Sequence, residues 1–399
     1  MKSVAGPAGG PAPLRALAGV WLAYFIGIGL FNPFAPLWFK ELGFSTLAIG
    51  TLASLQSWTR IGAPYAWGWL GDHSGHRVRL MRTAAGLSLL AAAALLWVRG
   101  YTGVALCTVL LYLANGGVVP LSEATLAHHL RTDTGMDSAR YGRVRMWGSV
   151  GFIGAVLLGG VLLQQLGIAA LPALLALSYG ALLVATLRVP DTPDDVSTQG
   201  QAMSVARLLR RPEVAWFFAS IFFTVLAHTG VYAFFSLYLD GLGYSKSAVG
   251  VLWALAALAE IGFFWFQGPL LSRLAPERWL QLAALGTALR FATVGGLGAW
   301  WPALVFAQVL HALTFGAHHA ACILLITRHF PGPLRGRGQA LYSMLGYGLS
   351  GVLGGLAGGW ISSRVGFAAV FWAAAACALL GLGCATLARR SSLGDAAPA

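Results

Sequence analysis

Ionisable side chains lie within long apolar stretches of this sequence, where burying a charge costs free energy. Glu260 lies in VLWALAALAEIGFFWF at 251–266, and the other residues of this kind are Glu123, Arg60, Arg145, Arg290, His228, His311, His318 and His319. A carboxyl held between desolvating surroundings and a nearby cation can bind and release a proton near neutral pH. A guanidinium offers a planar, bidentate fork to a carboxylate. These residue types predict proton transfer and anion binding.

The stretches that carry these residues are long enough to cross a bilayer. Hydrophobic residues make up 57% of the 399 residues and charged residues 10%, against about 25% charged in a soluble domain. Runs near the roughly 20 residues that span a bilayer as a helix predict twelve helices, near 14–39, 44–71, 79–98, 102–128, 142–166, 169–188, 213–239, 244–271, 277–298, 300–327, 337–363 and 366–388. Such runs form helices rather than a barrel. We expect an all-α membrane protein.

The formal charge of +13 is distributed in a way that predicts topology rather than a nucleic-acid-binding surface. With both termini in the cytoplasm, most of the 26 lysines and arginines fall at cytoplasmic ends and loops. On the other side lie Lys40, Arg99, Lys246 and Arg364. This asymmetry follows the positive-inside rule. We expect a multi-pass protein of a bacterial inner membrane, with both termini cytoplasmic and no nucleic-acid partner.

A repeat divides the chain into two similar halves. LWFKELGFSTLAIGTL at 37–52 aligns without gaps with LYLDGLGYSKSAVGVL at 237–252. We predict two six-helix bundles related by a pseudo-two-fold axis, at 14–188 and 213–388. A cytoplasmic loop at 189–212 joins them, and cytoplasmic tails lie at 1–13 and 389–399. Parallel repeats of this kind place the substrate site between the halves, near the midplane of the bilayer.

The loop after the second predicted span has glycines, an acid and a base at fixed spacing. It reads GWLGDHSGHRVRLMR, with Gly68, Asp72, Gly75 and Arg77 at the principal positions. The glycines permit a tight turn, Asp72 can face the positive end of a helix, and Arg77 can hold a carboxylate. The pattern resembles the loop 2–3 signature of the major facilitator superfamily, which implies a gating role in alternating access. The second half has Ser272 in place of the acid.

Five longer stretches resemble the 3-phenylpropionate permease group of that superfamily, which lies near the lactose permease and the nucleoside–proton symporters. They are AIGTLASLQSWTRIG, VVPLSEAT, YGRVRMWGSVGFIG, AVGVLWALAALAEIGFF and QVLHALTFGAHHAA, and they keep their order along the chain. The fifth span lacks the Gly-Pro pair of drug–proton antiporters, which argues against efflux. The resemblance implies the superfamily's fold and an aromatic monocarboxylate as the solute.

Arg60 and Glu260 are 200 residues apart, so they occupy equivalent positions in the two halves. Opposite charges across a central cavity suit a substrate anion on one side and a proton on the other. We predict that Glu260 is the main proton carrier; the alternative is a fixed structural ion pair. Arg60 is the first candidate for binding a substrate carboxylate and Arg290 the second. For both, pairing between helices is the alternative.

Glu123 and Arg145 lie on consecutive predicted helices and can approach each other. They resemble the acid–arginine pair of the lactose permease, which implies substrate binding and gating, with Glu123 also a candidate for proton coupling. The alternative is a plain salt bridge between the two helices.

Histidines of the tenth predicted span extend the set. His311 and His318 are seven residues apart, so we expect them on one helix face, about 10 Å apart. His311 and His319 match the family's histidines, which implies proton relay or hydrogen bonding to substrate. The alternative is a neutral buried histidine, which we favour for His318 and for His228. Other candidates for the substrate site are Gln56, Asn32, Tyr232 and Trp253.

The sequence as a whole predicts a secondary active transporter that imports a small organic solute together with protons by alternating access. The solute implied by resemblance is 3-phenylpropionate or a similar acid; a nucleoside or sugar symporter and an exporter remain alternatives. No Ser–His–acid set, metal-ligand cluster or Walker lysine is present. We therefore expect neither an enzyme nor a cofactor, but a monomer in the lipid bilayer driven by the proton gradient.

Overall fold

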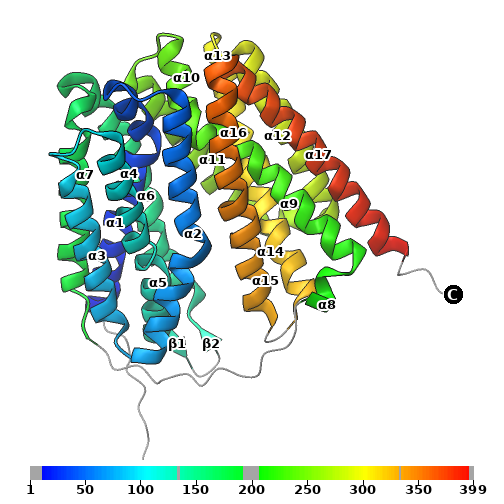
Figure 1. The fold of residues 1–399 in the computed structure, drawn as a ribbon. Helices are drawn as coiled ribbons and strands as arrows, with labels where there is room; N and C mark the ends of the chain where they lie inside the picture. Colours follow the sequence, from blue (N-terminus) through cyan, green and yellow to red (C-terminus); the bar gives the residue numbers. More distant parts are fainter. Residues whose placement is uncertain (1–10, 133–134, 192–205, 332–333, 395–399) are drawn as a thin grey trace, which may run out of the picture. The chain divides into compact units, whose positions relative to one another are not determined.

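The structure, a computed structural model, describes residues 11–132, 135–191, 206–331 and 334–394, which are almost entirely helical (Figure 1). The first half contains α1 (Pro11–Glu41), α2 (Thr46–Ser74), α3 (Arg77–Ala94), α4 (Tyr101–Asn115), α5 (Val118–His129), α6 (Ser138–Leu166), the short 3-10 turn η1 (Ile168–Ala170) and α7 (Leu171–Leu187). Two strands of two residues, β1 (Arg131–Thr132) and β2 (Gly135–Met136), pair antiparallel between α5 and α6.

The second half repeats this order of helices, and three π-helical segments interrupt it within the residues that the structure describes. It contains α8 (Ala206–Leu209), α9 (Pro212–Gly230), η2 (Val231–Phe235), α10 (Ser236–Gly241), α11 (Lys246–Leu271), α12 (Pro276–Leu297), α13 (Trp301–Val309), η3 (Ala312–Ala317), α14 (His318–His329), α15 (Arg335–Leu341), η5 (Tyr342–Leu349), α16 (Ser350–Arg364) and α17 (Phe367–Gly394). The π-helical segments are η2, η3 and η5.

All twelve predicted spans are helical, and the prediction of an all-α membrane protein is confirmed. Within the described ranges, ten helical stretches are long and apolar enough to cross a membrane, so the chain is a multi-pass integral membrane protein. The two predicted spans outside this set are α2 and α3. The 18-residue α3 begins with Arg77, Arg79 and Arg82, and α2 includes Arg60 and Asp72. Twelve spans therefore stay a prediction.

Contacts group the chain into two compact units. One consists of Met1–Trp38 with Gly62–Thr198, and the other of Phe39–Ile61 with Gln199–Ala399, so that α2 contributes its beginning to the second unit and its end to the first. In the first unit α3 packs against α4, α5 and α7, and in the second α17 packs against α9 and α12. The predicted tails and central loop lie partly outside the described residues. Where the tails are described they are helical, because α1 begins at Pro11 and α17 continues to Gly394.

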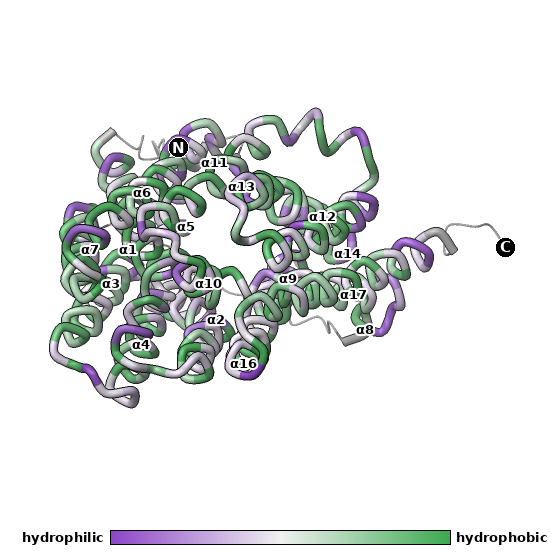
Figure 2. The backbone as a smooth tube through the Cα atoms, turned by 90° about the horizontal axis from the view of Figure 1, so that it is seen from above, coloured by the Kyte–Doolittle hydropathy of each residue, from purple (hydrophilic) through white to green (hydrophobic). Residues whose placement is uncertain are grey.

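Close packing holds the helices of each unit together. Apolar residues run along most of the helices (Figure 2), and lipid tails are as apolar as these side chains, so helix association depends on fit rather than on transfer from water. Within the second unit, a Cβ atom on Gly50 of α2 would meet backbone atoms of Gly355 and Gly359 on α16. Only glycine permits this approach.

The repeat is visible in the backbone at two turns. Gly43 and Gly243 adopt positive φ of 82° and 84°, a conformation that favours glycine. Ser45 and Ser245 then cap the next helices, accepting hydrogen bonds from the backbone N–H of Ala48 at 3.2 Å and of Ala248 at 3.1 Å. The aligned segments thus share backbone conformation as well as residues.

Candidate functional site

Arg290, His311 and Glu260 form a chain of contacts in the second unit. The Arg290 Nη1–H group donates to His311 Nδ1 at 2.9 Å. The other ring nitrogen, His311 Nε2, lies 3.4 Å from Glu260 Oε2. The side chain of Glu260 on α11 is 25% exposed and that of His311 is 14% exposed, whereas Arg290 on α12 is 1% exposed. Predicted proton-coupling and substrate-binding residues therefore meet at one place.

The contacts assign the tautomer of His311. A guanidinium has only donors, so Nδ1 must accept and carries no proton. The ring proton then sits on Nε2 and faces the Glu260 carboxylate. The imidazole is neutral and bridges a buried cation and an acid. While Arg290 donates to Nδ1, His311 has no free site for a second proton, so the Glu260 carboxylate is the member of these three contacts that can accept one.

Neutral side chains surround the buried Arg290 guanidinium. Besides His311, Arg290 donates to Gln308 Oε1 at 3.1 Å and to Thr314 Oγ1 at 3.3 Å. Thr314 lies 3.4 Å from His228 Nε2, and His228 Nδ1 bonds the carbonyl of Thr224 at 2.8 Å. No carboxylate of the described residues contacts Arg290 directly. A buried charge requires compensation. Here the compensating carboxylate is Glu260, and the neutral His311 ring connects it to Arg290.

Two members of this network, Gln308 and Thr314, were not predicted. The prediction rested on ionisable side chains within apolar stretches, and these two side chains are neutral. A signal is present: Gln308, His311 and Thr314 recur every three residues and so form a polar stripe on one helix. His228 has the structural carbonyl bond that we favoured for it, but its second nitrogen also extends the Arg290 network.

The expectation that His311 shares a helix face with His318 is wrong. The ring of His311 stacks on Phe315 at 5.0 Å, and Phe315 stacks on His319 at 6.4 Å, whereas His318 is buried against Cys322 Sγ at 3.7 Å. The π-helical segment η3 lies between the histidines. A π turn contains more residues than an α turn, so each residue rotates the chain less and the shared face shifts to His319.

Two other π-helical segments hold residues near this cluster. Tyr342, at the start of η5, bonds His319 Nδ1 through its hydroxyl at 2.9 Å and Tyr347 at 3.1 Å. Tyr232 of η2 lies beside Trp253, with ring centroids 6.0 Å apart. Single π-helical turns within α-helices are frequent at functional sites. All three interruptions in the second unit thus adjoin candidate site residues.

Arg60 and Glu260, which the repeat places at equivalent positions, make no direct contact in the part of the chain described here. Arg60 is exposed and has no hydrogen bond or ion pair among these residues. Tyr232 is 37% exposed and interacts electrostatically with Arg60, Glu260 and Arg290. Gln56 is half-buried on the same stretch of α2, in the second unit, whereas Asn32 is half-buried on α1 of the first unit.

Glu123 and Arg145 form a separate cluster in the first unit. Arg145 Nη1 lies 3.0 Å from Glu123 Oε1, so the two side chains approach each other as predicted. Tyr141 joins them: its hydroxyl donates to Glu123 Oε2 at 2.6 Å and accepts from Arg145 at 3.1 Å. The Arg145 guanidinium also lies over the Trp21 ring at 4.7 Å, a cation–π contact. With Arg145 44% exposed, this cation is open to further ligands.

The predicted gating loop contains an ion pair between its acid and its base. Arg77 Nη2 contacts Asp72 Oδ1 at 2.8 Å, so Arg77 holds a carboxylate within its own loop. Gly75 adopts a positive φ of 65° and makes the turn between α2 and α3. Gly68 does not contribute to the turn, because α2 continues through it to Ser74. The loop's sharp corner therefore depends on one of the two predicted glycines.

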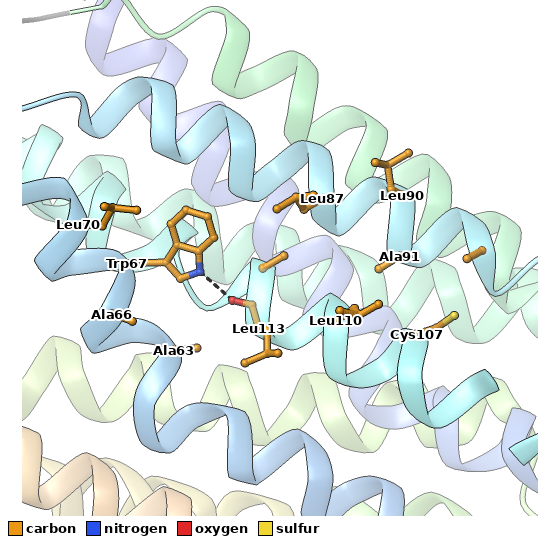
Figure 3. A pocket seen from close by; sticks show the side chains of 12 residues that line it. Ala63, Ala66, Trp67, Leu70, Leu87, Leu90, Ala91, Cys107, Leu110 and Leu113 are labelled. Atoms are coloured by element: carbon orange, nitrogen blue, oxygen red, sulfur yellow. Dashed lines mark hydrogen bonds between the residues drawn. The ribbon is translucent and has the colours of Figure 1, made fainter. Parts of the chain in front are cut away.

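A cavity of about 540 Å³ in the first unit offers no comparable chemistry. It lies among α2, α3 and α4 (Figure 3), and alanines and leucines dominate its lining. Its polar feature is Trp67, which donates from Nε1 to the carbonyl of Leu113 at 2.8 Å. None of the predicted site residues lines it. Size alone therefore does not locate the site.

Comparisons with known proteins agree with this architecture. A protein described as a probable 3-phenylpropionic acid transporter of Escherichia coli (strain K12) is 30% identical over 369 residues, which cover 92% of this chain and 95% of that protein. A maltose permease of Geobacillus stearothermophilus is 27% identical over 364 residues, 90% of each chain. A mutant of the nucleoside transporter NupG shares the fold, with a TM-score of 0.82 at 16% identity over 94% of this chain and 99% of that one.

These relatives are transporters, so the chain is a membrane transporter and not an enzyme, as predicted. A family model described as the MFS_1 like family matches residues 14–373, most of the 399-residue chain. The resemblance in the loop after α2 is thereby confirmed at the level of the family. This chain belongs to the MFS_1-like family of major facilitator superfamily transporters.

Proposed function

We propose that this protein imports an aromatic monocarboxylate, such as 3-phenylpropionate, together with protons. It works as a monomer in a bacterial inner membrane, with both termini cytoplasmic, and uses the proton gradient without a cofactor. The observation that carries the proposal is the chain Arg290–His311–Glu260, in which one acid compensates one buried cation through a neutral imidazole.

Charge balance links the proton to the solute. With Glu260 ionised, the chain of three residues has no net charge. A proton on Glu260 leaves the Arg290 cation uncompensated, which is costly at low dielectric. A substrate carboxylate entering nearby restores the balance, so proton and anion bind together. Release of the proton favours release of the anion, which is the thermodynamic requirement for symport.

Neighbouring residues supply contacts for an aromatic acid. Arg60 is exposed and lacks an ion pair among the described residues, so its guanidinium can bind a carboxylate bidentately. Tyr232, within electrostatic reach of Arg60 and Glu260, lies against Trp253 and offers an aromatic surface. The 30% identity to a probable 3-phenylpropionic acid transporter supports the same class of solute.

A sugar is the second candidate, supported by the 27% identity to a maltose permease over 90% of both chains. A neutral sugar would not compensate the buried cation, so coupling would need a different charge relation. Competition separates the two candidates: benzoate-type acids inhibit uptake if the solute is an aromatic acid, whereas maltose or a nucleoside inhibits if it is not.

The test is uptake of radiolabelled 3-phenylpropionate into proteoliposomes with an imposed proton gradient. We expect accumulation that a protonophore abolishes and that reverses when the gradient is reversed. Glu260→Gln should lose accumulation yet retain exchange of labelled for unlabelled solute. The matched control is Glu41→Gln, which neutralises an exposed acid at the end of α1 and should accumulate normally. Normal accumulation by Glu260→Gln would contradict the proton-carrier role.

A further inference from the structure

Three arginines surround a cavity of about 390 Å³ in the first unit, separate from the residues discussed above. Arg15 comes from the first turns of α1, and Arg140 and Arg143 from the first turns of α6. The remaining lining residues are Leu14, Ala18, Val144 and Trp147. The two helices pack closely beyond the cavity, where a Cβ on Gly148 would meet the Phe25 ring at 2.8 Å. The cavity is therefore held between helices in direct contact.

The positive charge of this cavity is largely uncompensated. Arg140 Nε lies 3.3 Å from Asp137 Oδ2, and both side chains are partly exposed. Arg143 donates from Nε to the carbonyl of Ala139 at 3.4 Å, which leaves its charge unneutralised. Among the residues that the structure describes, Arg15 and Arg143 have no carboxylate in contact. Three guanidinium groups thus face one acid, which favours an anionic ligand.

The position of the cavity along the helices indicates where that ligand comes from. The apolar stretches long enough to cross a membrane begin at Ala12 and Ala139, next to Arg15 and Arg140. The arginines therefore lie at the boundary between the hydrocarbon and the aqueous phase, the level of lipid head groups. Trp147 is 44% exposed beside them, in the position that tryptophan prefers at such interfaces. Leu14 and Val144 provide apolar contact next to the charges.

We propose that Arg15, Arg140 and Arg143 bind the phosphate of an anionic phospholipid. Guanidinium forks match phosphate oxygens bidentately, and basic pockets between helices at the membrane surface bind such head groups. The apolar lining contacts the glycerol and the first methylenes of the acyl chains. A free phosphate ion would use the arginines but gain nothing from Leu14, Val144 or Trp147, so the lipid is the ligand that fits the whole cavity.

The test uses the full-length protein in neutral phosphatidylcholine nanodiscs or detergent, titrated with phosphatidylglycerol. Binding is followed by native mass spectrometry and by the thermal unfolding midpoint. We expect the triple variant Arg15→Gln, Arg140→Gln and Arg143→Gln to bind phosphatidylglycerol about a hundredfold more weakly, since each arginine near an anionic surface contributes substantially. The control triple variant, Arg273→Gln, Arg278→Gln and Arg390→Gln, neutralises exposed arginines elsewhere and should bind like the wild type.

Two further arms make the outcome decisive. A triple Arg→Lys variant at the cavity keeps the positive charge and so controls for a loss of folding in the Arg→Gln variant. It should bind phosphatidylglycerol with intermediate strength, because lysine lacks the bidentate geometry of a guanidinium. Inorganic phosphate at millimolar concentration should not displace the lipid; full displacement would assign the site to the free ion and overturn the proposal. Equal binding of phosphatidylglycerol by the wild type and the Arg→Gln triple variant would also overturn it. Transport of 3-phenylpropionate is a separate readout, so failure here leaves the proposed function untouched.

Discussion

Lys40 and Asp240 occupy the same position in the two copies of the repeat, and they form a salt bridge of 2.7 Å between Nζ and Oδ2. Each is followed three residues later by a glycine with positive φ, Gly43 or Gly243. Equivalent residues of two repeats contact each other only where the repeats meet. The bridge therefore marks the junction of the turns 39–45 and 239–245 in the second unit.

This bridge is expected to have a small but measurable effect on transport. The side chains are 54% and 33% exposed, and exposed pairs contribute about 0.2–1 kcal/mol. In a double-mutant cycle of Lys40→Ala and Asp240→Ala, the exchange rate should show a coupling of at most about fivefold. The coupling should disappear at high salt, because salt screens exposed charges. Strictly additive single effects would contradict it. The control is Arg364→Ala, which removes an exposed cation that has no salt bridge to any described residue.

Substitutions of His311 separate its two contacts. Asparagine places its amide near the position of Nδ1 and can keep the Arg290 bond, but it does not reach Glu260. Glutamine reaches the position of Nε2 and leaves Arg290 with one acceptor fewer. We expect His311→Gln to lower stability more than His311→Asn does, since a hydrogen bond to a charged group contributes about 1.5–3 kcal/mol. We expect His311→Asn to lower proton-driven accumulation while stability stays near normal.

Thermal unfolding and protonophore-sensitive uptake, measured in parallel, distinguish these outcomes. His318→Asn is the matched control on the same span, because its ring contacts Cys322 and not the Arg290 chain. Equal effects of the asparagine and glutamine variants on both measurements would mean that His311 does not bridge the two groups.

Much of the fold could be predicted from the sequence, because it depends on local patterns. Apolar length predicts the helices, and the 200-residue repeat predicts the paired turns at Gly43 and Gly243, which demand glycine. Gly68 shows the limit of such patterns. Glycine within a motif does not by itself break a helix, and α2 continues through Gly68 to Ser74.

The residues of the candidate site could be predicted from their types, but the contacts between them could not. The repeat points from Glu260 to Arg60, whereas the structure places His311 beside Glu260. Helix rotation decides such contacts, and the π-helical segment η3 alters that rotation without a signal in the apolar pattern. Gln308 and Thr314 were missed for a related reason: a neutral side chain becomes informative only once the buried Arg290 that it solvates is located.

The Glu123–Arg145 pair is expected to affect transport more than stability. Its side chains are 28% and 44% exposed, so breaking the ion pair should cost about 1 kcal/mol or less. Glu123→Gln keeps an acceptor for the Tyr141 hydroxyl but removes the charge opposite Arg145. We expect a transport rate reduced at least severalfold with a nearly unchanged unfolding midpoint. Tyr141→Phe, which keeps both charges, should have a smaller effect; a normal rate in Glu123→Gln would make the pair purely structural.

Gly50→Ala should impair the protein although it adds one methyl group. That methyl would meet the carbonyl oxygen of Gly355 and lie 2.8 Å from Gly359 Cα, and backbone atoms cannot rotate away as a side chain can. Overpacking of this kind costs about 1–3 kcal/mol, so we expect a lower unfolding midpoint and slower exchange. Gly62→Ala on the same helix meets nothing within 4 Å and should be neutral or stabilising, because alanine favours helix over glycine by about 1 kcal/mol. If both variants shift the midpoint equally, helix propensity rather than contact between α2 and α16 governs this position.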